Sequence, residues 1–328
     1  MFNPMFYSTG NKTKVQSTKK ITALSRKRKV RIDMLHQRSL AACAVAAAGL
    51  LATAGPALAS FAPGISGFGN GSAFTLTGYT QDGFGNITDN NPPTISGGTL
   101  TITTASAGEA RAAFFNFPQA INNFTAAFTF QTDPTSFATL GPSDGFAFVL
   151  QNDSRGTAAI GGGGAGLGYG LMNNNQPPSG SPVLTAITPS ATAEFFLRNG
   201  NGATNVETGG TIDPNSGNTT GTVSLVSGDP IAVVLSYNGT TLTETLTDTT
   251  TPSDTYATSY AVDLVSALGG NFAYVGFTGG TGGGYSTQTI SNFTYSSTVP
   301  EPAALALMAV AGAGILLIRR KATGEKGN

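Results

Sequence analysis

The chain has 328 residues, and its 17 basic and 17 acidic residues cancel to a formal net charge of zero. The balance hides a separation, because residues 60–299 contain fourteen Asp or Glu but only three Lys or Arg. A net charge near −11 there argues against nucleic acid or anionic lipid as the partner of this segment. The only histidine, His36, and the only cysteine, Cys43, precede the segment. Thiol nucleophiles, histidine-based triads and histidine-ligated zinc are therefore excluded from it.

The N-terminal 59 residues have the features of an export signal. From Met34 the chain has a basic start, an apolar core over 40–52 and then Ala57-Leu58-Ala59. Small residues at Ala57 and Ala59 are typical of a signal-peptidase cleavage site, so residues 1–59 are predicted to be an N-terminal extension with a signal peptide. Whether translation starts at Met1 or Met34 stays open.

Between about 61 and 297, short alternating runs are bounded by Gly, Asn, Asp and Pro, which is the pattern of strands separated by turns. We expect strands at 98–103, 124–130, 222–226, 231–237 and 241–246. Asn238-Gly239 predicts a hairpin turn, because both residues accept positive φ. Apolar residues do not repeat at helical spacing over any long stretch, so residues 60–297 are predicted to form one large all-β sandwich.

The segment from Ser143 to Tyr169 is the most informative for function. Phe146, Phe148 and Leu150 alternate on one face of a predicted strand that follows an Asp144-Gly145 step. A glycine-rich run over 161–168 comes next, and another molecule can approach such a backbone closely. A fixed carboxylate beside open backbone suits a ligand with many hydroxyls, so a carbohydrate-binding rim is expected. The segment has no Trp, and the aromatic residues that could stack on a sugar, or simply pack, are Tyr169, Tyr274 and Tyr285.

The C-terminal residues 298–328 have three parts. Pro300-Glu301-Pro302 is followed by an apolar run over 303–318 and then by Arg319-Arg320-Lys321. Such a run can form a membrane helix whose basic end stays in the cytoplasm. The tail resembles the PEP-CTERM sorting signal of Gram-negative bacteria, which implies recognition by exosortase, transient anchoring in the inner membrane, and export to the envelope or extracellular matrix. An ordinary C-terminal anchor is the alternative.

Three blocks of the middle segment resemble the L-type (legume-type) lectins found on bacterial PEP-CTERM proteins. They are 144–150 with the glycine run up to 170, 193–195, and 274–282 with 290–295. The resemblance extends over about 61–296. It implies a concanavalin-like jelly-roll β-sandwich of two large antiparallel sheets, with the sugar site on loops at one rim.

The resemblance also implies the residues of the site. Asp144, held by a cis Ser143–Asp144 bond, matches the aspartate that accepts hydrogen bonds from the sugar. Gly163 or Gly164 matches the glycine whose amide donates, Thr278 to Gly282 match a rim loop, and Asn199 or Asn201 matches the loop asparagine. The expected carbohydrate-binding residues are therefore Asp144, Gly163, Gly164, Asn199, Asn201, Thr278, Gly279 and Gly280.

The metal ligands of these lectins are only partly matched. Glu194 matches the first carboxylate, but Phe196 stands at the position of the family's aspartate. The loop that follows offers amide oxygens, with no carboxylate before Glu207 and no histidine. Calcium takes six to eight oxygens, usually several of them charged. We therefore expect no transition metal and at most a weak calcium site at Glu194. Because calcium positions the loop asparagine in these lectins, we also expect the loss of its ligands to reduce the affinity for sugar.

The predicted function is that of an exported carbohydrate-binding protein acting on surface or matrix polysaccharide. The alternative is a structural or adhesive matrix protein, as in a biofilm, without a defined sugar site. A glycoside hydrolase would need two carboxylates about 5–10 Å apart across a cleft. Glu194 lacks an acidic neighbour along its strand, and Glu244 and Asp248 are expected on a solvated sheet face. No enzyme activity is therefore expected.

Overall fold

The computed structural model describes residues 64–82, 86–137, 141–171, 185–197 and 201–297. They belong to the second of two compact units, Ala62–Asn328. The predicted cleavage residues Ala57 and Ala59, the motif Pro300-Glu301-Pro302 with its helix over 303–318, and Asn199 lie outside the described residues. Within the described residues, no helix is long and apolar enough to span a bilayer.

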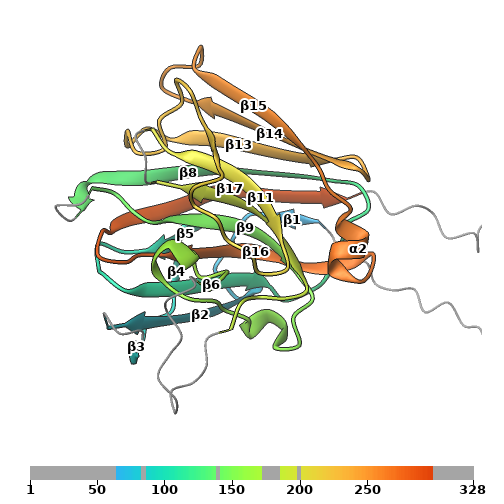
Figure 1. The fold of residues 1–328 in the computed structure, drawn as a ribbon, viewed down its shortest axis with the longest axis horizontal. Helices are drawn as coiled ribbons and strands as arrows, with labels where there is room; N and C mark the ends of the chain where they lie inside the picture. Colours follow the sequence, from blue (N-terminus) through green and yellow to red (C-terminus); the bar gives the residue numbers. More distant parts are fainter. Residues whose placement is uncertain (1–63, 83–85, 138–140, 172–184, 198–200, 298–328) are drawn as a thin grey trace, which may run out of the picture. The chain divides into compact units, whose positions relative to one another are not determined.

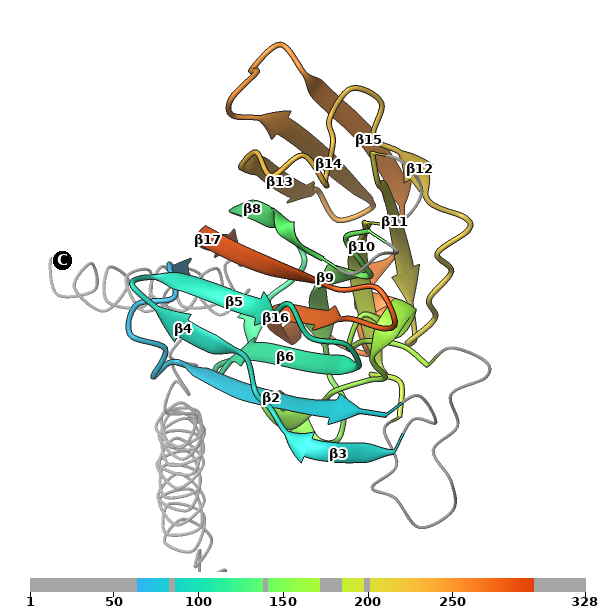
Figure 2. The same cartoon turned by 90° about the vertical axis from the view of Figure 1, so that its left-hand side faces the viewer.

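The strands form two antiparallel sheets, which appear as two layers in Figures 1 and 2. The first has nine strands. Its order is β12 (Asn218–Thr219), β11 (Ala203–Thr208), β10 (Ser190–Phe196), β9 (Gly145–Gln151), β16 (Phe272–Gly280), β6 (Glu109–Phe115), β2 (Phe74–Gln81) and β3 (Ile87–Asn90), and β7 (Gln119–Ala120) also pairs with β16.

The second sheet has eight strands. Its order is β15 (Thr255–Ala261), β14 (Thr241–Asp248), β13 (Ile231–Tyr237), β8 (Phe124–Phe137), β17 (Ser286–Ser297), β5 (Thr99–Thr103) and β4 (Thr94–Ser96), with β1 (Ile65–Ser66) paired to β17. The helical elements of the described segments are short: η1 (Gly156–Ala158), η2 (Gly164–Gly166) and α2 (Leu264–Leu268). The predicted all-β sandwich of two large antiparallel sheets is thus confirmed.

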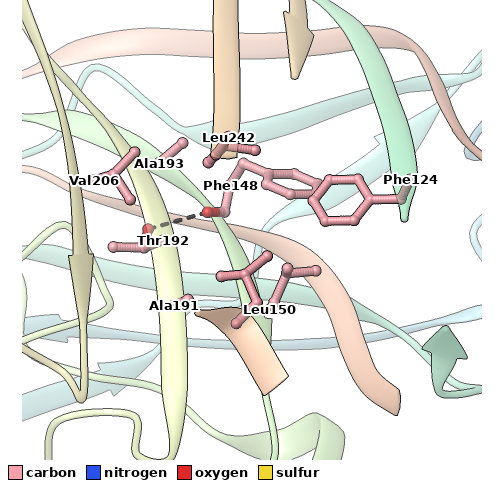
Figure 3. Close-up of a pocket in the computed structure, with 9 residues that line it drawn as sticks. Phe124, Phe148, Leu150, Ala191, Thr192, Ala193, Val206 and Leu242 are labelled. Carbon is pink, nitrogen blue, oxygen red and sulfur yellow. Dashed lines mark hydrogen bonds between the residues drawn. The ribbon is translucent and has the colours of Figure 1, made fainter. Parts of the chain in front are cut away.

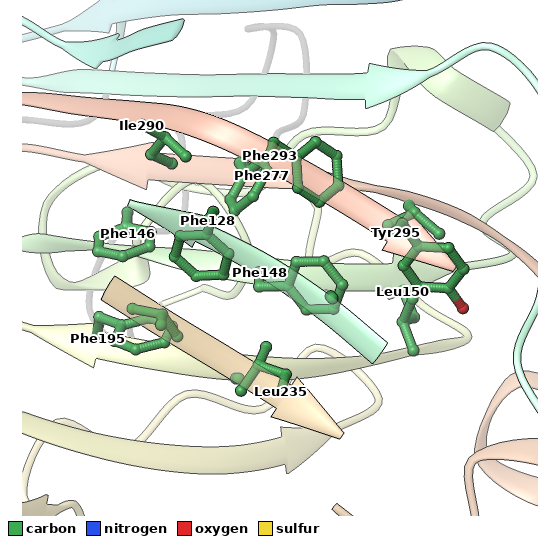
Figure 4. Packing of buried hydrophobic residues seen from close by; sticks show 14 of the residues in the cluster. Phe128, Phe146, Phe148, Leu150, Phe195, Leu235, Phe277, Ile290, Phe293 and Tyr295 are labelled. Carbon is green, nitrogen blue, oxygen red and sulfur yellow. The ribbon is translucent and has the colours of Figure 1, made fainter. Parts of the chain in front are cut away.

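Phenylalanine rings fill the space between the sheets (Figure 4). Phe146 of β9 stacks on Phe195 of β10, with ring centroids 4.5 Å apart. Phe128 of β8 packs edge-on against Phe277 of β16 at 5.0 Å, and this contact joins the two sheets. Such aromatic pairs add about 0.5–1.5 kcal/mol each beyond their buried area. The core is continuous because the inward residues of both sheets interdigitate.

Most of the strands expected from sequence are present, and the Asn238-Gly239 hairpin between β13 and β14 is confirmed. The strand expected over 222–226 is wrong. This segment begins with a local turn, in which the Val223 amide donates to Thr220 O, and its Leu225 amide donates to Asn201 O of another loop. Val223 and Leu225 are nevertheless buried in the core. The alternation of apolar and polar residues over 222–226 therefore marks a loop whose two apolar side chains pack in the core.

The expectation for Glu244 and Asp248 is also wrong. The threonines of β14 face away from the other sheet, as expected for a solvated face, but Glu244 and Asp248 lie on the opposite, buried side of the strand. Glu244 occupies the same side as Leu242 and Leu246, which belong to the core. Burial raises its pKa to about 8. Neither of its carboxyl oxygens has a hydrogen-bond partner among the described residues.

The two ends of the sandwich differ. We call the end that carries Asp144 the rim end. Strands β9 and β6 begin at this end, and β16 ends there. β17 leads from Ser286, beside Ser143, to Ser297 at the opposite end, where its arrowhead lies near α2 in Figure 1. Ile65 of β1 pairs there with Tyr295. We call this the exit end, because the described chain both enters and leaves it.

Candidate functional site

Asp144 lies at the start of β9, immediately after a cis Ser143–Asp144 peptide bond, as the resemblance predicted. Its backbone is fixed from two sides. Its amide donates to Gly280 O of β16 at 3.1 Å, and its carbonyl accepts from the Leu197 amide after β10 at 3.0 Å. The side chain is only 5% exposed, so its carboxylate lies just below the surface of the rim.

Two glycines lie against this carboxylate. A Cβ atom placed on Gly164 would be 3.7 Å from Asp144 Oδ2, and one placed on Gly282 would be 2.9 Å from it. Gly164 also has a φ of +59°, which favours glycine. The fold therefore brings the Asp144 carboxylate together with the glycine-rich run and the loop after β16. Because Gly164 and Gly282 have no side chains, neither residue covers the carboxylate.

The predicted amide donors are used within the chain. The Gly163 amide donates to Gln81 Oε1 and the Gly164 amide donates to Thr281 O, both at 2.9 Å. These bonds fix the glycine-rich run to β2 and to the loop after β16. In this arrangement neither Gly163 nor Gly164 directs its amide toward a ligand, although Gly164 still contributes the side-chain-free surface beside Asp144.

Thr278, Gly279 and Gly280 were expected on a rim loop, and this expectation is wrong. They are the last residues of β16 and pair with both β6 and β9. Gly279 is needed there, because a Cβ would approach Ile102 and Thr103 of the opposite sheet within 3.0 Å. The loop begins at Thr281, whose amide donates to Glu109 O at 3.0 Å and whose hydroxyl donates to Ser106 O at 2.7 Å.

A buried ion pair supports this loop, and the sequence analysis did not identify it. Arg111 Nη2 lies 2.6 Å from Glu109 Oε1, and the Thr104 amide donates to Glu109 Oε2 at 2.7 Å. Burial raises the pKa of Glu109, while Thr104 and Arg111 act in the opposite direction. The only available sequence signal was the alternation of Glu109 and Arg111 among alanines, which places both on one face of a strand.

Glu194, the candidate calcium ligand, is fully buried on the face of β10 that points away from the other sheet. Both of its oxygens lack a hydrogen-bond partner among the described residues. Burial, followed by the charges of Glu207 and Asp213, raises its pKa to about 9. Phe196, at the position of the family's aspartate, is also buried.

The residues do not fit a calcium site. The described part of the chain contains no group of three Asp, Glu, His or Cys side chains placed to hold an ion. Asn201 Nδ2 donates to Gly221 O at 2.9 Å, on an exposed loop. We therefore assign no role to a metal ion.

Of the aromatic candidates, Tyr169 is a packing residue. It is fully buried, and its hydroxyl lies 2.8 Å from Ser190 Oγ and accepts from the Gly210 amide at 3.0 Å. Tyr274 packs against the buried residues on the other side of the nine-stranded sheet. Tyr285 is half-buried and stands between Gly284 and Ser286 at the rim end. It is therefore the candidate that lies near Asp144 in the fold.

The cavity in Figure 3 is separate from the rim. It lies among apolar side chains of the core, including Phe124, Phe148 and Leu150, beside the Thr192 hydroxyl that donates to Phe148 O at 3.0 Å. Its volume of about 10 Å³ is room for a single water molecule at most. A sugar cannot occupy it, so the rim remains the candidate site.

Comparisons with known proteins agree with this architecture. The legume lectin domain matches residues 71–307, and the PEP-CTERM protein-sorting motif matches residues 298–321. No curated protein is similar enough in sequence to match the chain.

Similar solved structures are plant lectins. A lectin from Bauhinia forficata in complex with GalNAc is 21% identical, with a TM-score of 0.53, and the match covers 72% of this chain and 96% of that one. The Lotus tetragonolobus seed lectin is 16% identical with a TM-score of 0.54, covering 73% and 100%. The metal-free form of lectin I-B4 from Griffonia simplicifolia is 20% identical with a TM-score of 0.52, covering 71% and 97%. At this identity the structures show a shared fold. The chain therefore belongs to the legume lectin domain family, and it carries a PEP-CTERM protein-sorting motif at its C-terminal end.

Proposed function

We propose that the protein binds a surface or matrix polysaccharide at the rim, and that Asp144 is the principal hydrogen-bond acceptor. The observation that supports this most is the position of the Asp144 carboxylate against Gly164 and Gly282, two residues that have no side chain to cover it. Hydroxyl groups that donate to a carboxylate make charge-assisted hydrogen bonds, about twice as strong as neutral ones. Tyr285 is the residue that we propose for stacking on the sugar ring.

The proposed role is binding of a sugar without a metal ion and without an enzymatic reaction. Glu194 and Glu244 lie in different sheets, and each is buried away from the rim. The arrangement therefore supports a binding protein, exported and sorted through its tail, and gives no support to glycoside hydrolysis.

A glycan array probed with the exported chain tests the proposal, followed by titration of any sugar that binds. Asp144→Asn removes the charge at nearly constant volume. Since hydrogen bonds to a charged group contribute about 1.5–3 kcal/mol, we expect affinity to fall roughly 10- to 100-fold. Gly282→Ala should also weaken binding, because its Cβ would press on Asp144 Oδ2.

Gly270→Ala is the matched control, since no described atom lies within 4 Å of the added Cβ and the residue is at the exit end. Chelator should leave binding unchanged. A blank array for the wild type, or Asp144→Asn binding as strongly as the wild type, would contradict the proposal and favour the structural or adhesive role.

A further inference from the structure

The rim and the start of the sorting tail lie at opposite ends of the same strand. Ser286 begins β17 beside Ser143, and Ser297 ends it opposite Phe124. At about 3.3 Å per residue, β17 separates these two ends by about 35 Å. The tail therefore continues from the end of the sandwich that is farthest from Asp144.

Only a short connection separates Ser297 from the apolar run that starts at Ala303. Five residues lie between them, and the six Cα–Cα steps from Ser297 to Ala303 span at most about 20 Å even when fully extended. When the tail is inserted in a bilayer, this covalent limit keeps the exit end close to the membrane surface. The limit does not by itself decide whether the exit end touches the lipid.

Exposed aromatic side chains lie at the exit end. Phe117 follows β6 and is 56% exposed, and Phe272 begins β16 and is 40% exposed. The two segments are neighbours, because Gln119 of β7 pairs with Ala273 of β16. Among the described residues the other large exposed apolar side chain is Val234, which lies in the middle of β13. Phenylalanine is one of the apolar residues that membrane-surface segments bury at the boundary between headgroups and acyl chains.

The negative charges have the opposite distribution. Strand register places a set of aspartates at the rim end: Asp82, Asp133, Asp144, Asp229, Asp248 and Asp254. At the exit end, Asp153 is paired with Arg155 at 2.8 Å, and Asp263 caps α2. Glu207 lies in the half of β11 nearer this end, and Asp213 follows in the loop after β11, so the acidic groups are fewer here but not absent. An anionic membrane repels acidic groups within about a Debye length of its surface. The charge distribution therefore disfavours any orientation that brings the rim end to the bilayer.

From these observations we propose that, while the tail is in the membrane, the exit end rests on the bilayer through Phe117 and Phe272, and the rim faces away from it. The partner of this surface is the headgroup region of the lipid bilayer. The contact is an apolar one imposed by the tail, since the net negative charge of residues 60–299 gives no electrostatic attraction to anionic lipid. The inference depends on anchoring by the tail and is independent of sugar binding at the rim.

Site-specific labelling tests it in the full chain reconstituted into phosphatidylethanolamine–phosphatidylglycerol vesicles. With Cys43 replaced by serine, the chain has no other cysteine. A fluorophore is attached at Gly270→Cys, at the exit end, or at Ser253→Cys, in an exposed turn at the rim end. Lipids with a headgroup nitroxide should quench the first label severalfold more than the second. Combining Phe117→Ser with Phe272→Ser should remove most of that difference, whereas Val234→Ser should not.

Equal quenching of both labels, or stronger quenching at Ser253→Cys, would overturn the proposal. So would a difference that persists unchanged in the double phenylalanine variant, since the linker alone would then account for it. A chain that fails to enter the vesicles overturns it as well, because the proposed contact needs the inserted tail. None of these outcomes affects the glycan-binding measurement, which does not use vesicles.

Discussion

Glu194 and Glu244 are buried carboxyl groups whose pKa values rise to about 9 and about 8 in the folded protein. An unfolded chain releases these protons near pH 4.5, so between that pH and the folded pKa the folded state binds more protons. The extra protons held by Glu194 and Glu244 in the folded state add to the free energy of unfolding. This contribution is complete below about pH 4.5, falls as the pH rises, and is lost above the pKa of the folded state. We predict that the free energy of unfolding decreases from pH 5 to pH 9.

Denaturant titrations across this pH range check the prediction. Glu194→Gln should flatten the decline, because glutamine keeps the size of the side chain but cannot ionise. Asp89→Asn, at an exposed position on β3, is the control and should leave the slope unchanged. Stability that rises toward pH 9, or the same slope in Glu194→Gln, would be evidence against a neutral buried Glu194.

Single residues also show where sequence reasoning reached its limit. Asp144 could be identified because an Asp-Gly step precedes an alternating apolar strand, and the structure places it beside Gly164 and Gly282. The internal use of the Gly163 and Gly164 amides could not be foreseen. Their partners, Gln81 and Thr281, are distant in sequence and meet them only when the sheets assemble.

Among the elements, the loop between β12 and β13 behaves as part of the core. Leu225 is 1% exposed and belongs to the main cluster, and its amide is fixed by Asn201 O at 2.7 Å. We predict that Leu225→Ala lowers the free energy of unfolding by about 2–5 kcal/mol, as for a leucine in a sheet core. Urea unfolding measures the change. Thr222→Ala, on the exposed part of the same loop, should keep the free energy of unfolding within about 0.5 kcal/mol of the wild type. If both variants lost a similar amount of stability, the effect could not be assigned to the buried Leu225 side chain.

The ends of elements were harder to predict than their presence. Thr278 to Gly280 have the composition of a loop, yet they continue β16 because β6 and β9 supply hydrogen-bond partners on both sides. Glycine is accommodated at position 279, where the side chain of any other residue would collide with Ile102. Pairing partners of this kind come from strands far away in the chain, so local composition alone could not locate the boundary at Thr281.

At the scale of the whole molecule, the two sheets share one continuous core. We predict that residues 62–297, without the leader and the tail, unfold in one cooperative transition. Near-ultraviolet and far-ultraviolet circular dichroism should then give the same midpoint, with and without reducing agent, since this segment has no cysteine. Two separate midpoints would indicate that the sheets unfold independently.

The class of the fold was predictable because alternating strands, the absence of helical periodicity and the Asn238-Gly239 turn all indicate the same architecture. The pairing order of the strands was not. In the eight-stranded sheet, β17 lies between β8 and β5, which precede it by more than a hundred residues. The resemblance to the lectins supplied the jelly-roll class, but the sequence analysis gave no strand order.

Ile65 and Tyr295 lie opposite each other on adjacent strands, which makes the two boundaries of the sandwich close neighbours. A short glycine–serine bridge could join them, and new termini could be opened in the exposed turn between Thr251 and Pro252. Such a circular permutant would keep every strand pairing while moving its free ends to the side that carries Asp144. Any fused reporter would then lie at the rim end of the sandwich instead of at the exit end.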